Sequence, residues 1–197
     1  MPIPDEDQAL FVRLQAAGDT AAFETLYGKH KDAFFRYLRH LSGSDVIAAD
    51  LFQQSWLKLL ELARSGHYRS KPGASFQSYL YTLGRNHFVD AYQRRHEESR
   101  TESLELREAT SGLPDAAQPT PEEDAVSDRR NSLLLRALTQ LPPEQREVAV
   151  MWSQGWSIAE IAELTRAPPD TVGSRRKYAI KRLRELLAQH GLTEDPP

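Results

Sequence analysis

The strongest constraint on the fold lies in the last third of the chain, where a short apolar segment and a long basic segment are separated by a tight turn. Residues 158–164 have the apolar spacing of a short helix, and residues 169–189 have that of a longer helix crowded with cations. The four residues 165–168 between them leave room only for a turn. A basic helix that follows a short helix and a turn has the arrangement that enters the DNA major groove. The sequence therefore predicts a helix-turn-helix and a DNA-binding function.

The second of these helices divides into an apolar stripe and a polar, basic surface. The stripe, Val172, Ala179, Leu183 and Leu186, is expected to pack on the short helix. Arginine pairs with guanine edges or phosphates, and serine and threonine hydroxyls pair with either. A solvated basic helix is the alternative, but the preceding turn favours DNA contact. The candidate DNA-contacting residues are Thr171, Ser174, Arg175, Arg176, Lys177, Tyr178 and Arg182, with Lys181 widening the same surface.

The rest of the chain also shows helical spacing, and no window alternates with the period of a strand. We therefore expect an all-α fold of two small helical domains joined by an acidic flexible linker. Pro143 and Pro169 fit the first turns of helices, where a missing N–H costs nothing. The expected helices lie near residues 9–18, 20–41, 45–64, 75–96, 121 or 128 to 140, 143–153, 158–164 and 169–189.

The composition excludes several classes of protein and of site. Hydrophobic residues make up 40% of the chain, and no apolar run approaches the roughly 20 residues of a membrane span. The acidic N-terminus lacks the order of a signal peptide, so we expect a cytoplasmic protein without membrane insertion. The chain has no cysteine and six scattered histidines, which predicts no disulfide, no metal site and no cofactor.

The net charge of -3 conceals a division along the chain. Residues 97–127 carry two Lys or Arg and nine Asp or Glu, whereas the flanking blocks are each mildly basic. Such a segment cannot bury enough apolar surface to become ordered, which favours a plain tether. We expect a domain at 1–96, a linker at 97–127, the helix-turn-helix domain at 128–190 and a tail at 191–197.

The fourth expected helix is rich in aromatic residues and arginines. Asn86, Asp90 and Arg94 lie four residues apart on one line, and Arg85 and Arg95 add positive charge. Aromatic rings beside cations suit the stacking of unpaired bases, but the same rings also suit a hydrophobic core, and spacing alone does not separate the two interpretations. The large apolar residues are Phe76, Tyr79, Leu80, Tyr81, Leu83, Phe88 and Tyr92.

Five segments together resemble the extracytoplasmic-function sigma factors of bacterial RNA polymerase. The resemblance covers nearly the whole chain except the linker and tail, and its specificity rests on the order of the motifs. The helix-turn-helix alone also occurs in response regulators. The similar segments are Ala22–Tyr27, Asp50–Trp56, Phe76–Asn86 with Asp90 and Arg94-Arg95, Leu141–Glu147 and Thr171–Arg175.

The resemblance implies a transcription initiation subunit, not an enzyme, with core RNA polymerase and promoter DNA as partners. Residues 67–74 and the fourth helix would capture an unpaired base of the minus-ten element, and the last helix would read the minus-thirty-five duplex. The implied polymerase-binding residues are Asp50, Gln53, Gln54 and Trp56. The implied minus-ten residues are Arg69, Lys71, Ser75, Phe76, Tyr79, Arg85, Asn86, Asp90, Arg94 and Arg95.

The third helix departs from the family pattern, because Ala48-Ala49 precede Asp50 and Gln54 stands where Glu is usual. A phosphate on the neighbouring Ser55 would restore negative charge there, so a regulatory kinase is one hypothesis for control. Ser55 as an ordinary surface residue, with an anti-sigma factor covering the apolar surface near Trp56, is the favoured one. The acidic linker either solubilises the chain or mimics nucleic acid.

Two other functions compete with the sigma factor interpretation. A free-standing helix-turn-helix regulator needs no aromatic, basic fourth helix. A DNA-processing enzyme needs clustered carboxylates for metal ions or an activated nucleophile, and the acids of the third helix, Asp45, Asp50 and Glu61, form no tight cluster.

Overall fold

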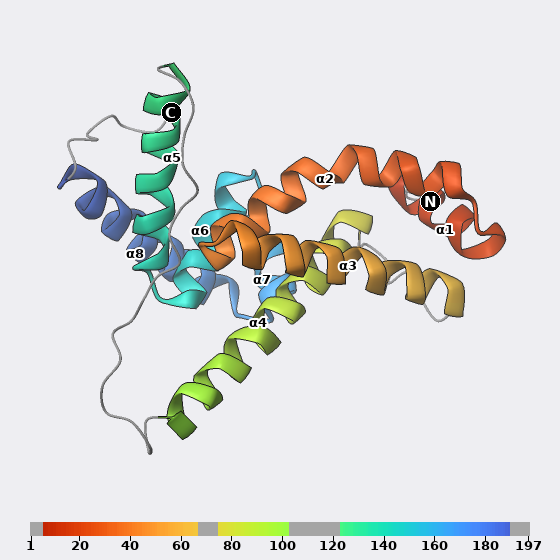
Figure 1. Ribbon diagram of the computed structural model, residues 1–197. Helices are drawn as coiled ribbons and strands as arrows, with labels where there is room; N and C mark the ends of the chain where they lie inside the picture. Colours follow the sequence, from red (N-terminus) through yellow and green to blue (C-terminus); the bar gives the residue numbers. More distant parts are fainter. Residues whose placement is uncertain (1–5, 67–74, 103–122, 190–197) are drawn as a thin grey trace. The chain divides into compact units, whose positions relative to one another are not determined.

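The structure is a computed structural model that describes residues 6–66, 75–102 and 123–189. Every regular element in these ranges is an α-helix, which confirms the all-α prediction (Figure 1). The helices are α1 (Glu6–Ala17), α2 (Thr20–Ser42), α3 (Asp45–Ser65), α4 (Phe76–Glu102), α5 (Glu123–Thr139), α6 (Pro143–Ser153), α7 (Ile158–Thr165) and α8 (Pro169–Ala188). No helix in the described ranges has the length and apolar character needed to cross a membrane.

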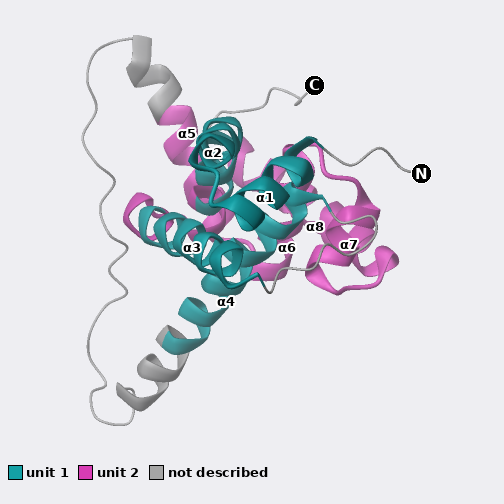
Figure 2. Cartoon of the chain, turned by 90° about the vertical axis from the view of Figure 1, so that its right-hand side faces the viewer, with its two compact units in different colours: residues 1–38, 49–113 teal, residues 39–48, 114–197 magenta. Residues whose placement is uncertain are grey.

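The chain forms two compact units, coloured separately in Figure 2. The first contains residues 1–38 and 49–113, and the second contains residues 39–48 and 114–197. Most of α1 to α4 therefore belongs to the first unit, and α5 to α8 belong to the second. The short stretch where α2 ends and α3 begins is grouped with the second unit.

Helix ends agree with the sequence where a local signal marks them, and differ where none does. Helix α6 has the predicted bounds, and α7 and α8 end within one residue of them. Helix α4, in contrast, runs to Glu102 rather than ending near residue 96. The acidic segment that follows residue 96 contains no glycine or proline before Gly112. No residue that breaks a helix therefore stands at the predicted end.

The corner between α1 and α2 is built from local signals. Gly18 adopts a left-handed φ of 62°, and its N–H donates to the Leu14 carbonyl at 2.9 Å, which ends α1. The Asp19 carboxylate then accepts the N–H of Ala22 at 3.1 Å and so caps the start of α2. Arg13 also donates to Asp19 at 2.6 Å on the exposed surface.

An aromatic cluster fills the core of the first unit. Trp56 of α3 meets Tyr27 and Phe23 of α2 with ring centroids 5.0 and 5.7 Å apart. Phe34 of α2 meets Tyr81 of α4 at 5.3 Å, and both side chains are fully buried. These contacts hold α2, α3 and α4 around one core, with aromatic pairs contributing about 0.5–1.5 kcal/mol each beyond area burial.

Gly84 is the residue that lets α4 approach α2 closely. A Cβ at this position would lie 2.7 Å from the Phe34 ring and 3.0 Å from Leu38. Because neighbouring atoms at that separation overlap, only glycine allows this packing without displacement of the core.

The core of the second unit joins α6, α7 and α8. Val148 and Met151 of α6, Ile161 of α7, and Val172 and Ala179 of α8 are fully buried. Helix α8 packs against each of α5, α6 and α7, so its apolar stripe is the centre of the unit. A buried Arg146 closes the turn before α6 by donating to the carbonyls of Thr139 and Leu141 at 3.0 and 3.3 Å.

Candidate nucleic-acid interfaces

The turn of the helix-turn-helix is defined by caps on both sides. At the start of α7, Ser157 Oγ accepts the Glu160 N–H at 3.2 Å, and the Glu160 carboxylate accepts the Ser157 N–H at 2.8 Å. This reciprocal pair is a capping box. The hydrogen bonds from Ser157 hold the pKa of Glu160 below its ordinary value. At the other end of α7, Arg166 has a left-handed φ of 55°, which turns the chain before α8 begins at Pro169.

Helix α8 presents its exposed polar residues opposite its buried stripe. Ser174, Lys177 and Tyr178 are exposed, with 61% of Tyr178 accessible, whereas Val172 and Ala179 have no accessible surface. Lys181 is exposed one turn beyond Lys177. The candidate side chains therefore form a continuous surface that a DNA groove can reach.

The remaining candidates on α8 are less uniform. Thr171 and Arg175 are half-buried, and Arg182 is exposed but pairs with Glu185 at 3.2 Å. Arg176 turns toward α6, where its guanidinium lies 5.3 Å from the centroid of the Trp152 ring. Arg176 is thus held by a cation–π contact beside the exposed surface.

Trp152 is a surface feature that the sequence interpretation missed. It is 43% exposed at the end of α6 and borders an open groove of about 800 Å³. Ile180 and the cations Arg176, Lys181 and Arg184 line the same groove. The sequence does offer a signal for this exposure. Trp152 lies in the last turn of the short helix α6, where a large apolar side chain need not be buried.

The first turn of α4 belongs to the core, which corrects one predicted contact. Phe76, predicted to contact the minus-ten element, has no accessible surface. Tyr79 is half-buried, with its ring 6.1 Å from Phe11 of α1. Ser75 precedes the helix and accepts the Ser78 N–H at 3.1 Å, so its hydroxyl acts as a cap. Phe76 is therefore a packing residue, whereas Tyr79 keeps part of its surface accessible and stays a candidate contact.

The second half of α4 has the exposed polar line that the spacing predicts. Asn86, Asp90 and Arg94 are all exposed, and Arg94 Nε donates to the Asp90 carbonyl at 3.3 Å. Arg85 is half-buried, and Tyr92 is 40% exposed. The other minus-ten candidates, Arg69, Lys71 and the side chain of Arg95, lie outside the described residues.

Helix α3 confirms an exposed polar stripe, but Trp56 is not part of it. Asp50, Gln53 and Gln54 are exposed, and Gln54 donates to Asp50 at 2.8 Å. Trp56 is only 4% exposed, because its ring lies in the aromatic cluster with α2. The apolar residue on the exposed stripe is Leu57, which is 52% exposed. Helical spacing places Leu57 one turn from Gln53 and Gln54, which indicates that it shares their exposed surface. The motif resemblance pointed to Trp56 instead.

The structure also contradicts an exposed Ser55. This residue is fully buried, and its hydroxyl donates to the Leu51 carbonyl at 2.6 Å. The Ser55 oxygen lies 3.2 Å from Nδ1 of His87 in α4. Burial is the main reason why the pKa of His87 lies below its ordinary value, and Lys58 acts in the same direction against Asp90 and Asp50. A kinase has no access to a hydroxyl in this position, so the structure excludes Ser55 as a phosphorylation site.

Within the part of the chain that the structure describes, no group of three or more His, Cys, Asp or Glu side chains is placed to hold a metal ion. The residues predicted to contact DNA lie instead on the exposed surfaces of α4 and α8, which belong to different units.

Comparison with known protein families matches both units. The Sigma-70 region 2 family matches residues 26–98, and the Sigma-70 region 4 family matches residues 132–183. The two regions occur in this order and leave the acidic segment between them.

Curated relatives align along most of the chain. The ECF RNA polymerase sigma factor SigL of Mycobacterium tuberculosis is 32% identical over 180 residues, which cover 90% of this chain and 96% of SigL. The ECF RNA polymerase sigma factor BldN of Streptomyces coelicolor is 28% identical over 192 residues, covering 94% of this chain and 69% of BldN.

Two solved structures share the fold. The sigma factor RpoE of Bartonella quintana, in complex with the anti-sigma factor NepR, has a TM-score of 0.62 at 23% identity, covering 84% of this chain and 96% of RpoE. CnrH, in complex with the cytosolic domain of CnrY, has a TM-score of 0.64 at 18% identity, covering 93% of this chain and 99% of CnrH. The family matches and the near full-length similarity to SigL together make this chain a member of the extracytoplasmic-function sigma factor family.

Proposed function

We propose that the chain binds core RNA polymerase and directs it to promoters, with each unit contributing one DNA contact. The observation that carries this proposal is the presence of a region 2 match and a region 4 match in order on one chain. A free-standing regulator needs only the second of these. The chain would act in the cytoplasm, where bacterial transcription takes place.

The surface of α8 would read the minus-thirty-five duplex. Ser174, Lys177 and Tyr178 form its most exposed part, and Lys181 extends it. Thr171, Arg175 and Arg182 would contact the flanking phosphates or base edges, and Arg176 would be held in place by Trp152.

The exposed line of α4 would contact the opened minus-ten element. Asn86 and Asp90 offer hydrogen-bonding groups that suit the edge of an unstacked base, and Arg94 offers charge for the backbone. The loop residues Arg69 and Lys71 are part of this proposal from the sequence alone.

Helix α3 would bind the polymerase through Asp50, Gln53 and Gln54, with Leu57 in place of Trp56 as the apolar contact. A polar stripe around one exposed leucine has the composition of a small protein interface. Because Ser55 is buried, we propose that an anti-sigma factor, rather than a kinase, controls access to this surface.

The test is to reconstitute the chain with bacterial core RNA polymerase and map transcription starts on genomic DNA. We expect discrete starts preceded by shared minus-thirty-five and minus-ten sequences. The isolated chain should bind the same duplexes only weakly, because two small domains on a tether offer few base contacts each. Nanomolar, sequence-specific binding by the free chain without polymerase would contradict the proposal and support a free-standing regulator.

A further inference from the structure

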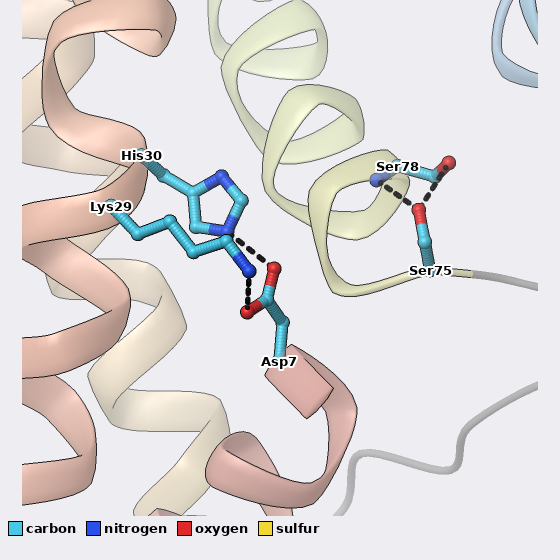
Figure 3. Close-up of polar contacts among 5 residues, drawn as sticks. All are labelled: Asp7, Lys29, His30, Ser75 and Ser78. Carbon is cyan, nitrogen blue, oxygen red and sulfur yellow. Dashed lines mark hydrogen bonds and ion pairs between the residues drawn. The ribbon is translucent and has the colours of Figure 1, made fainter. Parts of the chain in front are cut away.

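A buried carboxylate ties α1 to α2. Asp7 Oδ1 accepts from Lys29 Nζ at 2.6 Å, and Asp7 Oδ2 accepts from His30 Nε2 at 2.9 Å (Figure 3). The side chains of Asp7 and His30 are 6% and 9% exposed, whereas that of Lys29 is half exposed. Both carboxylate oxygens are therefore engaged, and α1 has one defined position on α2.

His30, one of the two residues that bind Asp7, also contacts the start of α4. The His30 ring lies 5.2 Å from the ring of the fully buried Phe76, and Phe11 of α1 lies 5.5 Å from the same ring. Phe76 is thus held between a residue of α1 and a residue of α2. Figure 3 also shows Ser75, which precedes α4, and Ser78 of its first turn, joined by their own hydrogen bonds.

The contact of Asp7 with Lys29 and His30 depends on the negative charge of the Asp7 carboxylate. Burial raises the pKa of Asp7, but hydrogen bonds and charge from Lys29 and His30 outweigh it, so that the pKa lies below its ordinary value. Asp7 is therefore a carboxylate at neutral pH. A buried carboxylate depends on its partners, because loss of one partner leaves charge without compensation.

Asp7 and Phe11 precede the region 2 match, which starts at residue 26. Sequence spacing offers no hint of the contact, since Asp7 and His30 are 23 residues apart. The contact becomes visible only when α1, α2 and α4 are packed together.

We propose that Asp7 and His30 are positioning residues for minus-ten recognition. They hold the first turn of α4 at Phe76, and thereby fix the direction in which α4 presents Asn86 and Asp90. This inference rests on the proposed minus-ten role of α4.

The test uses full-length chain with core polymerase and two promoters, one with the cognate minus-ten element and one with a single base substituted in it. Permanganate reactivity of unpaired thymines measures opening on each. The ratio of the two values does not depend on the fraction of active protein, so a loss of folded chain alone leaves it unchanged.

Asp7→Asn keeps the size of the side chain and removes its charge. We expect it to reduce the ratio about tenfold, because discrimination at one base pair of a site is typically worth about ten- to a hundredfold and depends on where α4 presents its side chains. Asp19→Asn is the matched control, because it also neutralises an acid that pairs with a basic residue next to α1. The Asp19 ion pair with Arg13 is on the exposed surface, so this variant should keep the wild-type ratio.

His30 provides a second, independent pair of variants. His30→Gln keeps a side-chain N–H that can reach Asp7 and should retain most of the wild-type ratio. His30→Leu keeps the apolar contact with Phe76 but has no donor, and should resemble Asp7→Asn.

Equal ratios for Asp7→Asn and Asp19→Asn, or for His30→Gln and His30→Leu, would overturn the inference while leaving the proposed function intact. Wild-type chain that fails to open the cognate promoter at all would overturn the proposed function and this inference together.

Discussion

Helices α4 and α8 both carry several arginines, both contain one interior glycine, and both were predicted to contact DNA, yet their glycines and aromatic residues lie in different surroundings. Gly84 in α4 lies against the Phe34 ring, whereas a Cβ at Gly173 in α8 would meet nothing within 4 Å. Phe76 in α4 is buried, whereas Tyr178 in α8 is 61% exposed. Helix α4 is thus a core helix with one exposed polar line, and α8 is a surface helix with one buried stripe. Similar residue types therefore have different roles in the two units.

The largest expected effect compares two tryptophans. Trp56→Ala should destabilise the first unit by about 3–5 kcal/mol, because it empties a buried aromatic site. Trp152→Ala should cost about 1 kcal/mol or less, since Trp152 is 43% exposed and contributes mainly its contact with Arg176. Chemical denaturation followed by circular dichroism measures both. Trp56→Phe is the control, and a larger loss for Trp152→Ala would reverse the assignment of core and surface.

The two glycines should respond with opposite signs. Gly84→Ala should destabilise the chain by about 1–3 kcal/mol, because the new methyl group overlaps the Phe34 ring. Gly173→Ala should stabilise it by about 0.5–1 kcal/mol, because alanine has the higher helix propensity and open space around it. The same denaturation experiment applies, and stabilisation by both substitutions would show that α4 is not packed closely on α2.

The extent to which the sequence predicts this molecule depends on the range of the interactions involved. The starts of α6 and α8 follow from Pro143 and Pro169, which act within one helical turn, and the structure shows that Ser157 caps the start of α7 in the same local way. The exposed lines of α4 and α8 follow from helical spacing. The burial of Trp56 and Phe76 depends on which helices pack together, and no local pattern determines that. The motif resemblance named both residues as contact residues, because a motif does not distinguish packing residues from contact residues.

The capping box of α7 should contribute an effect of intermediate size and a pH dependence. Ser157→Ala should cost about 1 kcal/mol, since it removes the acceptor for the Glu160 N–H. The pKa of Glu160 is lowered in the folded chain, so its contribution to stability is present above the ordinary pKa of glutamate. This contribution is lost as the pH falls through the lowered value. Denaturation at pH 7 and at pH 3 should show a smaller pH effect in Ser157→Ala than in the wild type, and an unchanged pH effect would mean that the box does not form in solution.

The smallest expected effect at neutral pH concerns Tyr81 in the core of the first unit. Burial raises the pKa of its phenol to about 12. Since this folded value lies above the ordinary value for tyrosine, the contribution to stability is complete below about pH 10 and is lost as the pH rises through about 12. Ultraviolet titration of the wild type should show one tyrosine ionising late that is missing from Tyr81→Phe. If Tyr81→Phe instead lost absorbance change near pH 10, the ordinary range of tyrosine, Tyr81 would be accessible to solvent.

The central claim is that the two units perform separate steps at a promoter, and one paired measurement tests it most directly. Holoenzymes with Asn86→Ala or Arg175→Ala are compared on one duplex promoter by footprinting of the minus-thirty-five element and by permanganate reactivity at the minus-ten element. We expect Asn86→Ala to retain the upstream footprint and lose thymine reactivity. Arg175→Ala should weaken the upstream footprint by about 1–3 kcal/mol if it makes a bidentate base contact. The same pattern of loss in both variants would contradict the division of labour between α4 and α8.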